Sequence, residues 1–98
     1  MKDIIENLDK VLESRIRLGT MSILMVNDSS DFNTLKKMLN VTDGNLASHI
    51  AALERNKYIK IRKKIIGKKT NTAYRITEAG RKAFNIHLEA LEKLIQKS

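Results

Sequence analysis

Residues 41–75 read VTDGNLASHIAALERNKYIKIRKKIIGKKTNTAYR, a helical pattern followed directly by a basic strand–turn–strand pattern. From Arg55 to Arg75 the chain has nine Lys or Arg and no acid. Residues 1–54 carry −2 (six bases, eight acids), and residues 76–98 carry +1 (four bases, three acids). The excess of +8 therefore comes from one short segment, and a positive field this concentrated predicts a polyanionic partner. A solvated lysine-rich surface is the alternative interpretation.

The first part of this stretch predicts a helix over 42–56. Thr42 is a suitable N-cap, and the acid after it favours the positive end of the helix dipole. Val41 and Leu46 stand at the spacing of a hydrophobic staple. The apolar residues at helical spacing, which are expected to face the core, are Leu46, Ile50 and Leu53. At about 100° per residue the opposite face carries Gly44, Ser48, Ala51, Ala52 and Arg55, with Asn45 and His49 on its flank.

From Tyr58 the apolar period changes to two, which predicts a β-hairpin. Ile59, Ile61 and Ile65 are expected on one face of its first strand. Lys60, Arg62 and Lys64 are expected on the other face. Residues 67–71 contain no apolar side chain and form the expected turn, and residues 72–76 alternate again as the return strand.

Helices are also expected before and after this stretch, so the chain is predicted to be one α+β domain, mainly α, over residues 1–98. Apolar periodicity predicts helices over 2–13, 15–27 and 34–39. A short strand at residues 31–32 is expected to join the hairpin. The expected caps are Ser14, Asn33 and Thr77, the last opening a long final helix to the end of the chain.

Two details of these outer helices can be tested directly against a structure. The helix over 34–39 is expected to bury Leu35, Met38 and Leu39, and Asn40 after it suits a left-handed C-terminal position. Gly80 falls early in the last helix, where its expected use is close packing. The two short helices before residue 57, joined by a tight turn, form a predicted helix-turn-helix.

Composition excludes several classes of site. The chain has no Cys, so disulfides and thiolate metal sites are excluded. No apolar run approaches the ~20 residues of a membrane span, and no secretory signal opens the chain, so a cytoplasmic protein without membrane contact is expected. The two His are far apart in sequence and no acid pair accompanies a nucleophile, so neither catalysis nor any metal or other cofactor is expected. Whether a small-molecule effector exists is left open.

Double-stranded DNA is the expected partner, because an α-helix fits the major groove and a basic loop follows phosphates or a narrow minor groove. The candidate residues of the helix are Thr42, Gly44, Asn45, Ser48 and His49, and those of the hairpin are Lys63, Lys64, Lys68, Lys69 and Asn71. Three of the helix candidates also have a structural interpretation. Thr42 caps the helix in any case, Ser48 is an inert surface residue in that reading, and His49 packs at the edge of the core.

Two blocks of sequence resemble the winged-helix domain of MarR- and ArsR-type bacterial and archaeal transcriptional regulators. They are NVTDGNLASHIAALE at 40–54 and TAYRITEAGR at 72–81, and the likeness covers about residues 14–90. The resemblance implies that the helix from Thr42 enters the major groove and that the wing around Gly67 contacts the flanking backbone. The chain lacks the paired C-terminal dimer helices of a full MarR protein, an Asp-x-Arg near the wing tip and the cysteine metal motif of ArsR sensors.

The first and last helices carry apolar faces that predict a homodimer. The expected interface residues are Ile4, Leu8, Val11, Leu12, Phe84, Leu88, Leu91 and Ile95, the last four at coiled-coil-like spacing. Intramolecular pairing of the same helices in a monomer is the alternative. The expected function is a dimeric, sequence-specific DNA-binding transcriptional regulator, a repressor, with helix 42–56 in the major groove and the 63–71 wing on the backbone or minor groove. A winged-helix module for protein interaction or RNA binding is the second hypothesis.

Overall fold

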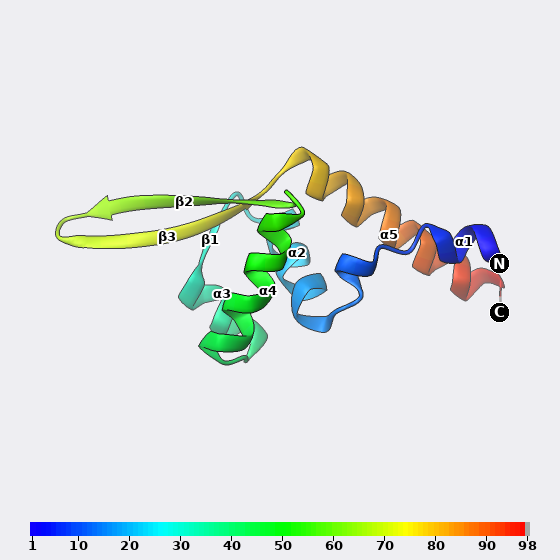
Figure 1. The fold of residues 1–98 in the computed structure, drawn as a ribbon, viewed down its shortest axis with the longest axis horizontal. Coiled ribbons are helices and arrows are strands. Elements are labelled where there is room, and N and C mark those ends of the chain that lie inside the picture. The colour runs from blue at the N-terminus through cyan, green and yellow to red at the C-terminus, as the bar shows by residue number, and fades with distance from the viewer. Residues whose placement is uncertain (98) are drawn as a thin grey trace.

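The computed structural model describes residues 1–97, apart from the side chains of Lys64 and Lys97. A helical body lies between a long β-hairpin at one end and the paired chain termini at the other (Figure 1). The elements in chain order are α1 (Lys2–Glu6), the 3-10 helix η1 (Lys10–Leu12), α2 (Arg15–Val26), β1 (Ser30–Asp31), α3 (Phe32–Leu39), α4 (Asp43–Arg55), β2 (Ile59–Ile66), β3 (Lys69–Ile76) and α5 (Glu78–Lys97). The α+β, mainly helical class expected from the sequence is confirmed.

The sheet has three antiparallel strands in the order β1-β3-β2. β2 and β3 pair along their whole length, from Ile59 opposite Ile76 to Ile66 opposite Lys69. The turn is therefore only Gly67 and Lys68, shorter than the expected 67–71. Gly67 has φ +64, a conformation that glycine adopts at the first central position of a tight hairpin turn. We call residues 59–76 the wing.

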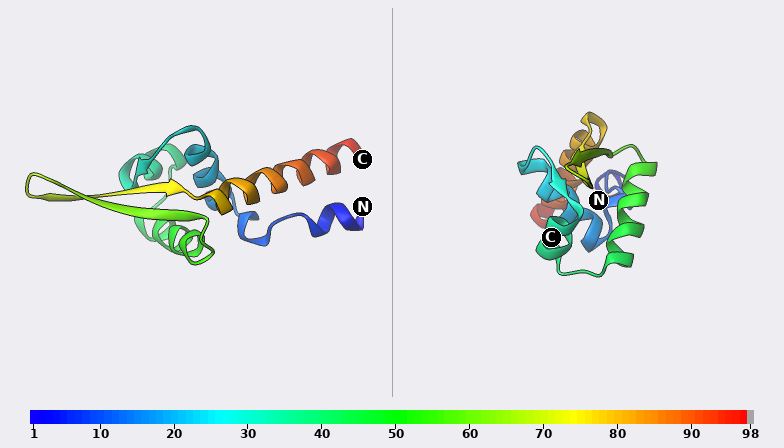
Figure 2. Two further views of the ribbon diagram at one scale, coloured as in Figure 1. Left: turned by 90° about the horizontal axis from the view of Figure 1, so that it is seen from above. Right: turned by 90° about the vertical axis from the view of Figure 1, so that its left-hand side faces the viewer.

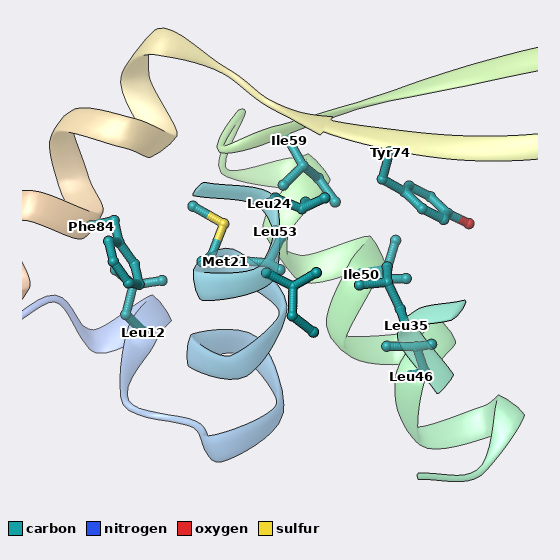
Figure 3. Close-up of a cluster of buried hydrophobic side chains, with 11 residues drawn as sticks. Leu12, Met21, Leu24, Leu35, Leu46, Ile50, Leu53, Ile59, Tyr74 and Phe84 are labelled. Carbon is teal, nitrogen blue, oxygen red and sulfur yellow. The ribbon is translucent and has the colours of Figure 1, made fainter. Parts of the chain in front are cut away.

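The core lies around α2, which is surrounded by the other helices and one face of the wing (Figure 3). The expected inner face of α4 is confirmed, because Leu46, Ile50 and Leu53 are all buried. Ile59 and Tyr74 close the core from the sheet side, as the period of two requires. The remaining buried members of the cluster are Leu12, Met21, Ile23, Leu24, Leu35 and Phe84.

The N-terminal segment differs from the single helix expected over 2–13. It forms α1 and the separate turn η1, because Asp9 leaves the helical path and makes three bonds of its own. Its carboxylate accepts from the Val11 backbone N–H at 2.9 Å and from the Tyr58 hydroxyl at 2.5 Å. Its own backbone N–H donates to Nδ1 of the buried His87 at 2.9 Å. Tyr58 and His87 lie far away in sequence, so local periodicity does not reveal these two bonds.

α3 begins two residues earlier than the sequence pattern indicates. Asp31 is the N-cap, since its side chain accepts from the Thr34 backbone N–H at 2.8 Å, and Asn33 lies inside the helix. Asn40 has φ +53, as its expected left-handed position requires. The prediction that Met38 is buried is wrong, because 61% of it is exposed while Leu35 alone in α3 is fully covered.

Candidate nucleic-acid interface

α4 is positioned by a polar cap and an ion pair at its N-terminus. The Thr42 hydroxyl accepts from the Asn45 backbone N–H at 3.2 Å, as expected for the N-cap. Asp43 forms an ion pair with Lys36 of α3 at 2.8 Å. The acid thus lies at the positive end of the helix dipole and is neutralised by a neighbouring cation. Capping and neutralisation together reduce the repulsion that this carboxylate would exert on a phosphate.

The outer face of α4 is a strip of small and polar side chains. Gly44, Asn45, Ala47 and Ser48 are exposed, and a Cβ at Gly44 would meet nothing within 4 Å. The Ser48 hydroxyl donates to the Asn45 carbonyl at 3.1 Å. Seen from the wing end, α4 lies at the edge of the body with no element outside it (Figure 2). This strip admits close approach of a flat or grooved partner.

Ala52, assigned to the outer face of α4 from the sequence, lies elsewhere, and His49 packs at the edge of the core, the alternative that the sequence left open for it. Ala52 is buried, because the helix packs more than its narrow apolar stripe against the body. His49 is half-buried and its Nδ1 accepts from Arg17 Nε of α2 at 3.0 Å. Burial lowers the pKa of His49, and the positive Arg17 lowers it further. In a neutral imidazole that accepts at Nδ1, the proton is on Nε2, which leaves one donor nitrogen.

The cations of the wing lie along an exposed ribbon. Lys60, Arg62, Lys69 and Arg75 share one face by alternation, and Lys63 lies on the other. Lys63, Lys68 and Lys69 are exposed, and Asn71 is half-buried. The side chain of Lys64 lies outside the described part of the structure. Among the wing cations whose side chains are described, none forms an ion pair with an acid. Lys60, Arg62 and Arg75 therefore extend the basic surface beyond the five hairpin candidates expected from the sequence.

A set of hydrogen bonds at Lys57 and Tyr58 holds α4, the wing and α5 in a defined arrangement. Lys57 adopts a left-handed conformation, with φ +61, and its carbonyl accepts from the Thr77 hydroxyl at 2.6 Å. The Tyr58 carbonyl accepts from the Thr77 backbone N–H at 3.0 Å. Burial, together with the hydrogen bond to Asp9 and its negative charge, raises the pKa of the Tyr58 hydroxyl to about 12. This junction sets the angle between the wing and the outer face of α4.

The apolar residues of the expected dimer face fall into two groups. Leu12 and Phe84 are buried in the core of the chain itself, and Ile4 is buried where α1 packs against α5. These three belong to intramolecular packing, the alternative that the sequence left open, and the expectation that they line a partner is corrected. In the second group, Leu8, Val11 and Leu91 are half-buried, and Leu88 and Ile95 are exposed.

The described residues offer neither the side-chain group of a metal site nor the helix of a membrane span. Within residues 1–97, no group of three or more His, Cys, Asp and Glu side chains is arranged to hold a metal ion. None of the helices in that part of the chain is both long and apolar enough to cross a membrane. The exposed features considered for binding are the outer face of α4, the basic wing and the exposed apolar residues near the termini.

A family model described as a winged helix DNA-binding domain matches residues 16–95. The chain belongs to this winged-helix family. The match includes both the outer face of α4 and the entire wing, as well as most of α5. The resemblance to winged-helix transcriptional regulators expected from the sequence is confirmed.

Relatives of this winged-helix chain come from archaea and bacteria. It is 33% identical to uncharacterized protein MJ0432 of Methanocaldococcus jannaschii. The 85 aligned residues cover 87% of this chain and 92% of that protein. A transcriptional regulator homologue protein from Pyrococcus horikoshii OT3 has 33% identity and a TM-score of 0.88, covering 99% of this chain and 97% of that one. The transcriptional regulator Cth-833 from Clostridium thermocellum has 26% identity and a TM-score of 0.72, with coverage of 91% and 94%.

Proposed function

We propose that the protein is a sequence-specific regulator of transcription that binds double-stranded DNA as a homodimer. The observation that carries this proposal is the exposed small-residue face of α4 beside a wing whose described cations have no acidic partners. A helix of this kind fits a major groove about 12 Å wide, where Asn45 and Ser48 would meet base edges. The wing would then follow the flanking backbone or minor groove and supply most of the electrostatic affinity.

Repression is the mode of regulation that needs the fewest additional surfaces. A two-fold dimer with recognition helices about 34 Å apart covers two successive major grooves. A protein bound across a promoter in this way blocks access of the polymerase by occupancy alone. The DNA-binding surface is sufficient for that action, whereas activation requires a further contact with the polymerase.

The wing lysines are expected to determine how steeply binding depends on salt. The double change Lys68→Ala and Lys69→Ala removes two exposed cations from the wing. The plot of log K against log salt has a negative slope. Each lost phosphate contact is expected to make that slope shallower by about 0.9 per chain. Gel shifts with a duplex recovered from a random pool, repeated at several salt concentrations, measure that slope.

Lys82→Ala and Lys93→Ala remove the same charge from exposed positions of α5, outside the wing, and serve as the control. Equal slopes for the wing and control variants would contradict the proposed role of the wing. Binding to an A-form RNA duplex of the same length tests the RNA-binding hypothesis. The proposed DNA-binding mode predicts weak binding to this RNA, because its deep, narrow major groove does not admit α4. Tighter binding to that RNA than to the DNA would overturn the proposed function.

The proposed dimer uses the exposed part of the apolar residues near the termini, centred on Leu88. Leu88 and Ile86 are both exposed on α5, but at about 100° per residue their side chains point about 160° apart around the helix. Leu88→Glu is expected to convert the dimer to a monomer, because it places a charge in an apolar interface. Ile86→Glu tests the other side of α5, where Ile86 lines a shallow cleft with Leu8. A dimer that survives Ile86→Glu but not Leu88→Glu confines the interface to the Leu88 side. Sedimentation at tens of micromolar measures the mass, and a one-chain mass for the unchanged protein would exclude the dimer.

A further inference from the structure

The end of the wing carries two adjacent isoleucines, Ile65 and Ile66, that are 80% and 62% exposed. Neighbouring residues of a strand point to opposite faces, so the ribbon is apolar on both faces at this level. Across the hairpin they pair with Thr70 and Lys69, and the turn beyond them is Gly67 and Lys68. We call residues 65–70 the wing tip.

Packing within the chain leaves both isoleucines exposed. Ile59 and Ile61 lie on the same face as Ile65, and they are buried and half-buried respectively, whereas Ile65 extends past the body. β1 pairs with β3 only as far as Ala73, so four further residue pairs, about 13 Å of ribbon, project beyond it. Ile66 borders an open cleft with Met38 and remains mostly exposed. The projection of this ribbon away from the body is plain in Figure 1.

The electrostatic setting of the isoleucines indicates the partner that would cover them. They lie in a segment with nine cations and no acid, so the charge complement is a polyanion. On duplex DNA, apolar side chains gain burial against sugars and base faces, which are reached from inside a groove. The proposed function already assigns the major groove to α4. The minor groove beside it is the position that the wing reaches.

We propose that the wing tip enters the minor groove and wedges Ile65 and Ile66 against a base-pair step, opening and bending the duplex. This inference rests on the proposed function. The minor groove of B-DNA is about 6 Å wide, whereas the backbones of two paired strands already stand about 4.8 Å apart before their side chains are added. The ribbon therefore requires a widened groove. Apolar wedges of this kind unstack a step and bend DNA by about 20–90° toward the major groove.

The wedge also makes the wing a source of sequence preference without hydrogen bonds to bases. Pyrimidine–purine steps such as TA and CA unstack readily, while A-tracts are stiff and have a narrow groove. Sites with a flexible step under the wing tip are expected to bind more tightly than sites with an A-tract there. The lysines around the tip hold the phosphates on both sides and do not discriminate between these steps.

The test compares Ile65→Ser/Ile66→Ser with Val26→Ser, a control in which another aliphatic side chain, 81% exposed, is removed from α2. The probe is a duplex selected from a random pool by the unchanged protein, labelled at its ends for energy transfer and carrying 2-aminopurine at each step in turn. The unchanged protein and the control are expected to bend the duplex and to raise 2-aminopurine fluorescence at one step in each half-site. The double variant is expected to lose both signals and to bind roughly 10-fold more weakly, with an unchanged salt slope.

The outcomes separate this inference from the function on which it rests. Failure of the unchanged protein to bind any duplex contradicts the proposed function itself. Binding without bending or local unstacking leaves that function standing and overturns the wedge. The wedge is also overturned if the double variant bends the duplex as the unchanged protein does. A fall in sedimentation mass of the double variant would assign the isoleucines to self-association and likewise overturn it.

Discussion

Changing Ser48 to glutamate is expected to weaken DNA binding at least about 100-fold without unfolding the protein. Ser48 is exposed at the centre of the outer face of α4, and its hydroxyl donates to the Asn45 carbonyl one turn earlier. A carboxylate at this position would face phosphates and acceptor-rich base edges in the major groove. Like charges brought together at an interface cost several kcal/mol, which corresponds to that loss of affinity. Filter binding on a selected duplex measures it.

Gln96→Glu is the charge-matched control for this variant. Gln96 is exposed near the end of α5, at the opposite end of the molecule from the wing, and its change adds the same negative charge. The control is expected to bind DNA as the unchanged protein does. Both proteins should unfold at nearly the same urea concentration, because substitutions at exposed sites usually change stability by less than about 0.5 kcal/mol. Normal binding by Ser48→Glu would show that α4 is not the recognition helix.

Gly80→Ala is expected to destabilise the protein by about 3 kcal/mol, although alanine is the better helix former by about 1 kcal/mol. A Cβ at Gly80 would stand 2.2 Å from the Tyr58 carbonyl oxygen and 2.9 Å from its carbon. That carbonyl already accepts from the Thr77 backbone N–H, so the backbone cannot retreat without breaking this bond. For a domain of this size, such a loss lowers the melting temperature by roughly 15 °C. Thermal unfolding followed by circular dichroism measures the change.

Gly44→Ala gives the opposite expectation at another helical glycine. A Cβ there meets nothing within 4 Å, so the melting temperature is expected to rise slightly. If Gly80→Ala raised it as well, the close contact between α5 and the Tyr58 backbone would be disproved. DNA binding by Gly44→Ala separately reports how closely the backbone of α4 approaches the duplex.

Much of the fold was predictable because its strongest signals are local. The cap at Thr42 and the inner stripe of α4 follow from periodicity over a single helix. The hairpin follows from the change to a period of two, and the short strand expected at 31–32 forms one residue earlier, at 30–31. The observed turn, Gly67 and Lys68, is shorter than the expected 67–71 because lysine and threonine are equally compatible with a loop and with an exposed strand.

The errors occur where distant parts of the chain meet. Asp9 ends the first helix because it bonds to Tyr58 and to His87, 49 and 78 residues away in sequence. Arg17 holds His49 against the body from another helix, which a helical-face argument based on α4 alone does not include. Met38 lies at an apolar position of a short helix, yet no other element covers it fully.

The amino-acid pattern alone was sufficient for the helix with a small-residue face and for the basic hairpin, and the resemblance of residues 40–54 and 72–81 to known regulators indicated the family. The helix and the hairpin depend on periodicity, capping and charge, which act between residues close in sequence. Packing across the fold settled which apolar residues of the first and last helices remain exposed, and how the wing stands relative to α4. Burial at a given site depends on which distant segment covers it, and that information is a property of the assembled chain.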